Sequence, residues 1–459
     1  MPKKKTALTI EERLQQALVP AEEQPYEVPE NWVWVRLGEV VDVLNGDRGK
    51  NYPAKSTLSK EGIPFISAAN LCDNIVVEDD LLCMSEEQYS KLSAGKLMLN
   101  DIVLCIRGSL GKHGKFPFKK GAIASSLVIL RSKDRGRLTD GYVMQYLDVP
   151  LFYDEIKKYD NGTAQPNLAA KNLELFSFPL PPLSEQQRIV ERIEELFAKL
   201  DEAKERLQEA ADSFAVRKAA ILHKAFTGEL TKQWRRENGV SDESWEDVSL
   251  DSVCKSIYDG DHMPPPKSET GIPFLVISNV NTGFISFEKC RFVPEEYYDG
   301  LSETRTPEIG DILYTIVGSY GIPVMVDTDK KFCFQRHMAL LKPKDIYNRF
   351  LWRQLQTQSF FEQATSIATG TAQLTVPIKG LRKLIVKCPT LPEQHEIVRL
   401  IDDLLARERK AQQAAEQALA SIDLMKKSIL ARAFRGELGT NKASEASALE
   451  LLRQVLAEN

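Results

Sequence analysis

The sequence predicts two mixed α/β (α+β) domains in tandem repeat, separated by two long antiparallel helices that form a coiled coil. Three observations support this fold class. The chain has 459 residues, which is too many for one ordinary hydrophobic core. Its sequence is written twice, with a period of about 208 residues. In each copy, short β-branched and aromatic runs cut by Gly, Pro, Asn and Asp precede a long stretch without helix breakers.

The repeat extends along most of the chain and involves both apolar and polar residues. The matching segments, first copy and then second, are Trp32 and Trp245, GIPF at 62–65 and 271–274, Asn70 and Asn279, Asp101 and Asp311, GSLG at 108–111 and GSYG at 318–321, GTAQ at 162–165 and 370–373, LSEQ at 183–186 and LPEQ at 391–394, and AFTGEL at 225–230 and AFRGEL at 433–438. A period this long indicates a duplicated domain-plus-helix unit rather than a solenoid.

The repeat divides the chain into consecutive parts. They are an N-terminal segment at 1–31, a first domain at 32–182, a central helix at 183–230, a second domain at 245–390, a C-terminal helix at 391–438 and a tail at 439–459. In the N-terminal segment, Thr9 and Glu12 form a capping box, and in the tail 446–459 has the pattern of a short amphipathic helix. Disordered ends are the alternative for both segments.

Both long helices carry an apolar residue at alternating steps of four and three, the spacing of a coiled-coil seam. Pro392 stands at the start of the second helix, where its missing N–H costs nothing. Arg217 and Glu408 interrupt the two patterns. About 44 residues at ~1.5 Å each give a rod of ~66 Å, which suits a spacer. The principal seam residues are Ile189, Ile193, Leu196, Leu200, Leu207 and Phe214 in the first helix, and Ile397, Ile401, Leu404, Ile422, Met425 and Ile429 in the second.

Composition restricts the class of protein further. No apolar run approaches the ~20 residues that cross a bilayer, so we expect no membrane association. The basic start lacks the apolar stretch of a secretory signal, and we therefore expect a cytoplasmic protein. Seven cysteines form an odd number without a CxxC pair, which indicates neither a disulfide framework nor a zinc site.

The net charge of −5 argues against nucleic-acid binding when taken alone, because independent DNA binders usually carry a basic excess. Its distribution argues the other way. Between Arg107 and Arg137 there are nine Lys or Arg residues and one acid, Asp134, whereas acidic residues concentrate in the helical stretches. The sequence therefore predicts one basic surface in the first domain and acidic helices.

A globular domain, a long helix opened by LSEQ and closed by AFTGEL, and then the same order again resemble the specificity subunits of type I restriction-modification systems. The resemblance covers almost the whole chain, from Trp32 to Leu438. It implies two target-recognition domains, each reading one half of an asymmetric bipartite site in double-stranded DNA. It also implies that the helices set the spacer between the half-sites. TGEL at 227–230 is similar to the element whose copy number sets spacer length in some members, and it occurs once.

The same resemblance implies that this chain is not an enzyme and holds no cofactor. Its partners would be two modification (methyltransferase) subunits and ATP-dependent restriction subunits. S-adenosylmethionine, ATP and Mg²⁺ are then expected in those partner subunits. The residues agree, because we find no adenine methyltransferase motif, no Walker motor and no nuclease constellation in the sequence.

The loops that differ between the copies are the candidate DNA-binding sites, because shared segments suit a scaffold and different loops suit different targets. Glycines in such loops allow close backbone approach, and Arg and Lys offer phosphate or guanine contacts. An ordinary solvated surface is the alternative at each position. The candidates are Arg48, Lys50, Asn70, Arg107, Lys112, His113 and Lys115 in the first copy, and Asp261, His262, Lys267, Asn279, Tyr320, Arg336 and His337 in the second.

Other chemistry fits these loops less well. Gly108 and Gly114 are too far apart for a Walker A loop, and Phe116 stands where Ser or Thr is needed. Asp261, His262 and His337 have no third ligand at a recognisable spacing, so we predict no metal site. Gln165 and Gln373 of the GTAQ segments brace a turn or touch DNA. A duplicated coiled-coil scaffold that binds only proteins is the main alternative function, and a catalytic fusion is the weaker one.

Overall fold

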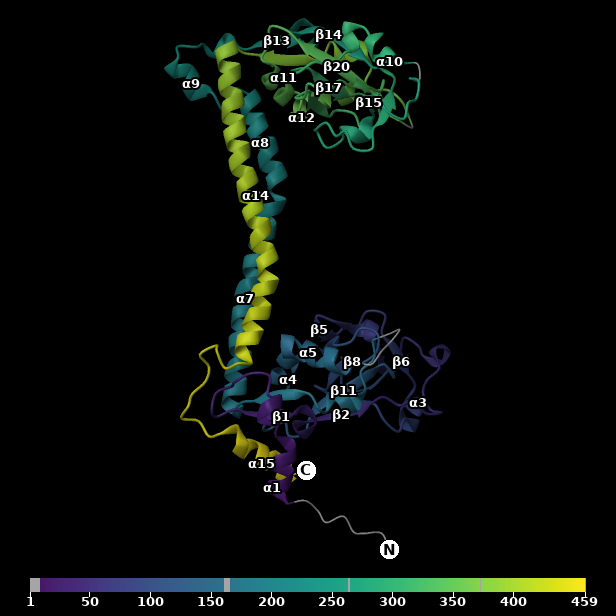
Figure 1. Ribbon diagram of the computed structural model, residues 1–459, viewed down its shortest axis with the longest axis vertical. Coiled ribbons are helices and arrows are strands. Elements are labelled where there is room, and N and C mark those ends of the chain that lie inside the picture. Colours follow the sequence, from purple (N-terminus) through teal and green to yellow (C-terminus); the bar gives the residue numbers. More distant parts are fainter. Residues whose placement is uncertain (1–8, 161–165, 263–264, 372, 459) are drawn as a thin grey trace. The chain divides into compact units, whose positions relative to one another are not determined.

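The computed structural model describes residues 9–160, 166–262, 265–371 and 373–458. They form two compact units (Figure 1). The first unit comprises residues 1–206 and 418–459, and the second comprises residues 207–417. The units therefore do not coincide with the sequence repeats. Each unit combines the globular domain of one repeat with the final helical residues of the other.

The first unit contains three sheets. A two-stranded antiparallel sheet joins β1 (Val33–Arg36) to β12 (Ser177–Leu180). A six-stranded sheet has the order β2 (Val41–Asn45), β11 (Leu127–Ser132), β8 (Ile102–Cys105), β9 (His113–Lys115), β5 (Asn74–Val76) and β4 (Leu71–Cys72). A four-stranded sheet has the order β6 (Leu82–Met84), β3 (Ile63–Ile66), β10 (Lys120–Ile123) and β7 (Lys96–Met98).

The second unit repeats this topology with fewer strands. β13 (Glu246–Ser249) pairs with β21 (Ile385–Cys388). A four-stranded sheet has the order β14 (Cys254–Asp259), β20 (Met338–Pro343), β17 (Ile312–Thr315) and β18 (Pro323–Met325). A three-stranded sheet has the order β16 (Arg291–Val293), β15 (Ile272–Leu275) and β19 (Cys333–Phe334). In both units, the GIPF strand pairs in parallel with a strand near the middle of its domain, β3 with β10 and β15 with β19.

Short helices connect and cover these sheets. In the first unit they are α1 (Ile10–Ala17), α2 (Leu37–Val40), α3 (Glu86–Lys91), α4 (Asp140–Leu147), α5 (Pro150–Tyr159), α6 (Ala170–Leu173) and α15 (Ala448–Glu458), with 3-10 turns at Ala21–Glu23, Lys55–Thr57 and Ala68–Asn70. In the second they are α9 (Lys232–Glu237), α10 (Glu295–Asp299), α11 (Asn348–Gln354), α12 (Gln358–Ser366) and α13 (Ile378–Leu381), with 3-10 turns at Asp242–Ser244, Leu250–Val253, Ile277–Asn279 and Glu303–Arg305.

The long helices begin where the sequence places them. α7 (Leu183–Asp212) is followed after Ser213 by α8 (Phe214–Phe226), so the first predicted helix is interrupted once, whereas α14 (Leu391–Ala433) is continuous. In the first unit, Ile189 and Ile193 of α7 share a core with Leu430 and Phe434. Early residues of α7 thus pack against late residues of α14, which makes this pair antiparallel.

Most of the predicted seam faces inward within its own unit. Ile189, Ile193, Phe214, Ile397, Ile401 and Ile422 are buried, and Leu196, Leu200, Leu207, Leu404 and Ile429 are half-buried. Met425 is 49% exposed, so its assignment to the seam is corrected. The neighbouring Lys426 lies inward instead, with its ammonium 5.0 Å from the Phe197 ring and 2.6 Å from Asp201.

The two interruptions of the seam pair with each other. Arg217 Nε donates to Glu408 Oε2 at 2.8 Å within the second unit. The Arg217 guanidinium also covers the Phe214 ring at 4.3 Å and contacts Ser213, the residue at the break between α7 and α8. A polar pair in an apolar seam specifies register, because any slip would leave both charges without their partner.

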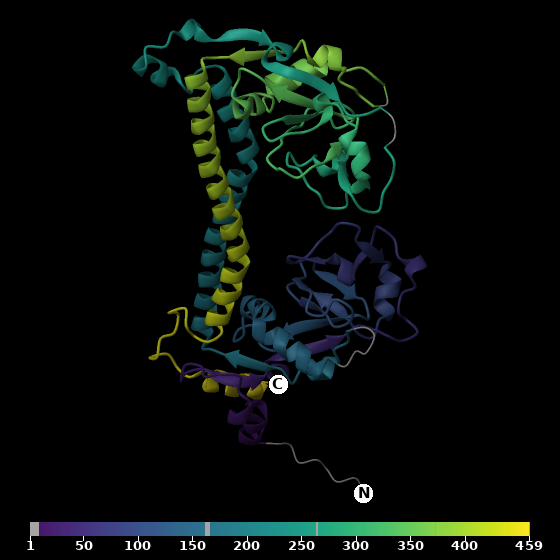
Figure 2. The same cartoon turned by 45° about the horizontal axis from the view of Figure 1, so that its top comes forward.

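The two ends of the described chain form helices that lie side by side in the first unit (Figures 1 and 2). The predicted capping box is present at α1, where Thr9 Oγ1 accepts from Glu12 N at 3.3 Å and the Glu12 carboxylate accepts from Thr9 N at 2.8 Å. Arg453 of α15 pairs with Glu11 of α1 at 3.2 Å. The alternative of disordered ends is therefore wrong for the residues of α1 and α15. Among the described helices, none combines the length and apolar character needed to cross a membrane.

Candidate nucleic-acid interface

Each globular domain is fixed to its long helix by a buried carboxylate. In the first unit, Trp32 Nε1 donates to Glu185 at 2.7 Å, and Thr440 Oγ1 donates to the other oxygen of that carboxylate at 3.3 Å. In the second unit, Trp245 Nε1 and Thr231 Oγ1 donate to Glu393 at 3.1 and 2.6 Å. Both carboxylates are fully buried. The Thr comes from the end of the other repeat, so these bonds also join the two repeats.

Gln186 and Gln394, the next residues in LSEQ and LPEQ, make a second equivalent attachment. Gln186 Oε1 accepts from Thr139 N at 3.0 Å, and Gln394 Oε1 accepts from Tyr347 N at 2.8 Å. The sequence showed these motifs only as helix starts. Their duplication was the signal that could have identified them as anchors, since a helix cap alone does not require a buried Glu-Gln pair.

The loops that differ between the repeats lie at one edge of the largest sheet in each unit, the six-stranded sheet in the first and the four-stranded sheet in the second. The edge is the equivalent one in both units. In the first unit, β2 and β8 end and β11 begins at this edge, and in the second, β14 and β17 end and β20 begins there. Ile106 N donates to Ser126 O at 2.9 Å, and Ile316 N donates to His337 O at 2.9 Å. These bonds hold the loop after the central strand beside the start of the neighbouring strand.

In the first unit, this edge brings together Arg48 and Arg107. Arg48 lies 3.4 Å from the carbonyl of Ser125, next to the Ser126 that holds Ile106. Arg107 is exposed, and its Nε donates to Asn167 at 3.1 Å. Lys112 is exposed and donates to Ala68 O at 3.0 Å, and Lys115 and Lys50 are exposed. The exposed cations therefore remain candidates for DNA contact.

His113 is a correction to the candidate set. It is buried, its Nδ1 lies 2.9 Å from Gly111 O, and its Nε2 lies 3.8 Å from Asp148. Burial raises the pKa of the Asp148 carboxyl, and the nearby His113 ring opposes that shift. The flanking lysines gave His113 the pattern of an exposed basic loop, but β9 packs against the α4 segment at this point, and Asp148 lies beside the ring.

Asn70 and Asn279 are also corrected, because both are buried in equivalent turns. Asn70 Oδ1 accepts from Ser67 N at 3.0 Å, and Asn279 Oδ1 accepts from Val276 N at 3.0 Å. Asn279 Nδ2 donates to Glu288 O at 3.1 Å. Their polar atoms hold the turn after the GIPF strand, so the repeated Asn belongs to the scaffold.

In the second unit, four candidates gather at the equivalent edge. Asp261 forms a β-bridge with Gln335, the residue before Arg336 and His337. His262 is exposed, and its Nε2 lies 2.9 Å from Asp259. Burial, with a contribution from Arg336, lowers the pKa of His337, which favours its neutral form at pH 7. A neutral imidazole provides one donor and one acceptor, a combination suited to a base edge.

Tyr320 and Lys267 lie differently. Tyr320 stacks on Phe361 with a centroid distance of 5.4 Å, and its hydroxyl contacts Thr365 Oγ1 at 3.1 Å. It is half-buried, so the ring supports the GSYG loop while part of it stays accessible. Lys267 is exposed in the segment before β15. Asp261 accepts from Tyr297 at 3.3 Å, and no group of three or more His, Cys, Asp or Glu side chains in the described ranges is placed to hold a metal ion.

The second GTAQ segment ends at Gln373, which adjoins the GSYG loop. GTAQ at 162–165, with Gln165, lies outside the described residues. In the second unit, Gly318 N donates to Leu374 O at 3.0 Å, and a Cβ placed on Gly318 would lie 2.9 Å from Gln373 Nε2. Gln373 therefore lies directly against the GSYG turn, an arrangement that supports the bracing interpretation.

Much of the predicted basic surface of the first domain is neutralised within the unit. Asp101, which is fully buried, pairs with Arg131 at 2.6 Å and with Arg135 at 3.1 Å. The hydrogen bond to Asp101 raises the pKa of Arg131. Arg137 pairs with Asp134 and with Glu458, and Lys120 pairs with Glu86. Within the described residues, the cations without an ion pair are thus Arg107, Lys112 and Lys115 in the loop, together with Lys119 and Lys133.

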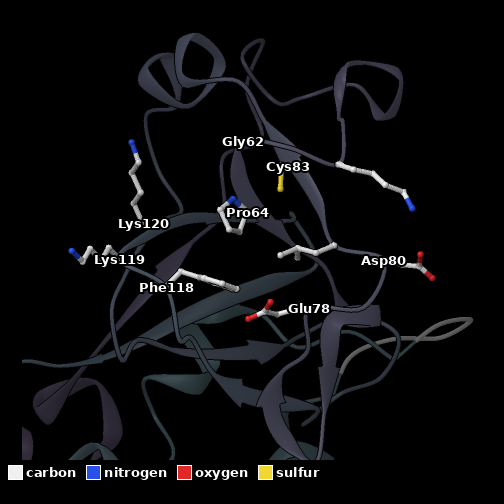
Figure 3. A pocket seen from close by; sticks show the side chains of 10 residues that line it. Gly62, Pro64, Glu78, Asp80, Cys83, Phe118, Lys119 and Lys120 are labelled. Carbon is white, nitrogen blue, oxygen red and sulfur yellow. The ribbon is translucent and has the colours of Figure 1, made fainter.

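A hollow of about 590 Å³ lies on the other sheet of this domain. Figure 3 shows Lys119 and Lys120 at one side of it, with Glu78 and Asp80 at the other. Its lining comes mainly from β3, β6 and the segments around them, not from the edge that carries Arg48 and Arg107. Opposite charges at its two sides give it no uniform attraction for an anion.

Two copies of one α/β domain, each anchored to a long helix and each presenting different polar residues at one sheet edge, define a class of duplicated recognition protein. A sequence model of the family described as "Type I restriction modification DNA specificity domain" matches residues 29–211 and 242–417. Since these matches cover most of the sequence, the chain belongs to this family.

Individual relatives agree with this family. The chain is 26% identical to the type I restriction enzyme EcoKI specificity subunit of Escherichia coli (strain K12), over 94% of this chain and 96% of that protein. It is 27% identical to the MjaVIII specificity subunit of Methanocaldococcus jannaschii, over 86% and 92%. The crystal structure of an HsdS subunit from Thermoanaerobacter tengcongensis has the same fold, with a TM-score of 0.65, 20% identity and coverage of 91% and 100%.

Proposed function

We propose that this chain is the DNA-reading subunit of a type I restriction-modification complex and that each unit reads one half of an asymmetric, bipartite duplex target. One observation carries the proposal. The same sheet edge is built in both units by the same backbone bonds, yet it presents Arg48 and Arg107 in one and Asp261, His262 and Arg336 in the other. Equivalent frames with different polar groups suit two half-sites of different sequence.

The proposed contacts include both phosphate and base contacts. Arg107 and Arg48 have the planar donors that fit guanine O6 and N7, and Lys50, Lys112 and Lys115 suit phosphates. Asp261 and His337 suit base edges that offer donors or acceptors. In this account the chain contributes no catalytic residue, and S-adenosylmethionine, ATP and Mg²⁺ act in partner subunits.

The experiment is selection from random duplexes by the complex of this chain with its methyltransferase partner. We expect enrichment of two half-sites separated by a fixed gap. Arg107→Ala should relax one half-site only, and Arg336→Ala should relax the other only. No enrichment at any salt concentration would refute DNA recognition and favour the alternative, a scaffold that binds only proteins.

We further propose that the helices dock two methyltransferase subunits and that ATP-dependent restriction subunits join that complex. Val216 of α8 is 70% exposed and Leu424 of α14 is 67% exposed, and they occupy equivalent positions of the two repeats. Two equivalent exposed apolar residues suit a partner present in two copies. Val216→Glu or Leu424→Glu should reduce the number of bound methyltransferase subunits from two to one in native mass spectrometry. Retention of both subunits by the double variant would place the docking surface elsewhere.

A further inference from the structure

A cleft of about 1520 Å³ in the second unit is lined by residues of its long helices and of its globular domain. The lining includes residues of α8, α11 and α14, among them Lys218, Arg353 and Arg409. It also includes Asn281–Ile285 and residues 321–323, which directly follow the GSY of the variable loop. The cleft therefore opens beside a loop that we propose to read DNA.

The cleft lining contains four cations, Lys218, Arg349, Arg353 and Arg409, and five carboxylates, Asp212, Asp327, Asp402, Asp403 and Glu408, so what distinguishes the cations is how they pair. Asp402 pairs with Arg349 at 3.0 Å and with Arg353 at 2.6 Å. Asp403 and Glu408, which also line the cleft, are engaged by Arg399 and Arg217. Lys218 and Arg409 have no hydrogen-bond or ion-pair partner within the described residues.

Arg353 is the buried member of this group of cations. Its residue is only 9% exposed, and its Nε has no hydrogen-bond partner among the described residues. Burial lowers its pKa, and the nearby Arg349 and Arg409 act in the same direction against Asp402. Burial together with Arg353 and Arg409 also lowers the pKa of Lys218. Among these four cations, Arg349 and Arg353 share Asp402, which leaves Lys218 and Arg409 without a carboxylate partner among the described residues.

The equivalent positions in the first unit carry the opposite charge balance. Lys218 corresponds to Lys426 and Arg409 to Asp201, and these two form an ion pair at 2.6 Å. Arg349 and Arg353 correspond to Gly141 and Gln145, and Asp402 to Glu194. At these five positions the first unit has one cation and two carboxylates, whereas the second unit has four cations and one carboxylate. The cluster of Lys218, Arg349, Arg353 and Arg409 therefore has no counterpart at the equivalent positions of the first unit.

We propose that Lys218, Arg353 and Arg409 bind a phosphate of the DNA backbone beside the GSYG loop (318–321) of the second unit. This inference rests on the proposed DNA-reading function. Ammonium and guanidinium groups are the side chains that most often bind phosphates. Asn281 and Thr282, which also line the cleft, add neutral donors.

An acidic segment of a methyltransferase subunit is the competing ligand. A partner that docks in two copies would use features present in both units, whereas this cluster occurs in one. A single duplex passes each unit once, so a one-sided cluster fits DNA better. The cluster would then contribute affinity without sequence preference, and it would hold the duplex in register for the neighbouring loop.

The test uses the complete complex with its methyltransferase partner, and measures its dissociation constant for target and scrambled duplexes across a series of salt concentrations. Arg409→Asp introduces the residue found at the equivalent position of the first unit and gives Lys218 a partner. We expect the slope of log K against log salt to decrease by about 1 to 2, at ~0.9 per lost phosphate contact. Affinity should fall by a similar factor on both duplexes, and the selected half-sites should not change.

Lys218→Gln provides a second, milder variant and should reduce the slope by about 1. Lys426→Gln is the matched control in the first unit and should leave the slope unchanged. Unchanged slopes for both Arg409→Asp and Lys218→Gln in folded complexes would overturn the proposal. Loss of methyltransferase binding with a normal slope would also overturn it and assign the cluster to that partner. Failure of the unaltered complex to select any target would instead refute the proposed function itself.

Discussion

Substitution of Glu393 should destabilise the second unit much more than the equivalent substitution of Glu185 destabilises the first. Glu393 Oε1 accepts hydrogen bonds from Thr231, Trp245 and Arg235, the last at 2.8 Å. Arg235 is itself buried, and its remaining acidic partner, Asp242, is mostly exposed. Glu185 accepts only from neutral donors, on Trp32, Thr440 and Asn441.

The magnitudes follow from these partners. Glu393→Gln keeps an acceptor for Trp245 and Thr231 but leaves the Arg235 charge without its buried partner. Loss of a hydrogen bond to a charged group costs about 1.5–3 kcal/mol, and breaking a buried ion pair from one side costs about 3–5 kcal/mol. We therefore expect about 3 kcal/mol for Glu393→Gln. With neutral donors only, Glu185→Gln should cost about 1 kcal/mol.

Hydrogen exchange measured by mass spectrometry resolves the two units, because peptides from β14 and β2 report on different cores. Protection should fall in β14 for Glu393→Gln and remain unchanged in β2. The double variant Arg235→Met, Glu393→Gln should recover part of the loss, since it removes both buried charges. Equal destabilisation by Glu185→Gln and Glu393→Gln, or no recovery in the double variant, would refute this account of the anchors.

Three further predictions follow from the architecture. TGEL at 227–230 lies in the turn after α8, and insertion of one further copy after Leu230 should lengthen the selected gap, because it adds four residues between the two recognition domains. Sequencing of selected duplexes should show unchanged half-sites, and altered half-sites would contradict the prediction. Exchange of residues 32–178 for another recognition domain should alter one half-site in the same assay, and a change in both would disprove modular reading. Burial raises the pKa of Glu155, whose Oε2 has no partner among the described residues, so ionisation opposes folding above the ordinary carboxyl pKa. Glu155→Gln should therefore stabilise the first unit by about 1 kcal/mol at pH 7 and by almost nothing near pH 4 in urea unfolding, and a larger gain at pH 4 would contradict the sign.

The sequence predicted the fold class well because the duplication is visible residue by residue. Helix starts at Leu183 and Leu391 follow from local rules, since a proline-rich segment or Pro392 precedes a long run of helix formers. The break at Ser213 was not predicted. It lies beside a tertiary contact that local rules do not reveal, in which Arg217 donates to Glu408 about 190 residues away.

The candidate site was predicted less completely, for a physical reason that differs between residues. His113 lies between exposed lysines in sequence, but the tertiary packing of β9 against the α4 segment buries its ring. Arg131 and Arg135 look like part of a basic surface until the fold brings Asp101 against them. Lys218 and Arg409 lie in helical stretches that the sequence marked as acidic, and only the packing of α8, α11 and α14 brings these cations together.

The compact units are offset from the sequence repeats, so each unit contains residues of both repeats. This offset explains how such a chain could vary its DNA target while the anchors between its domains and helices stay the same. Thr440 completes the anchor of the first domain, and Thr231 completes that of the second, so each domain is fixed by residues at the end of the other repeat. Neither Thr lies in a globular domain, and neither do Glu185 and Glu393. The globular domains contribute Trp32 and Trp245, which directly precede β1 and β13, and the loops at the sheet edge contribute nothing to these carboxylate anchors. Substitution of loop residues should leave the spacing set by the helices intact, whereas substitution at an anchor should disturb one unit without changing which bases its loops contact.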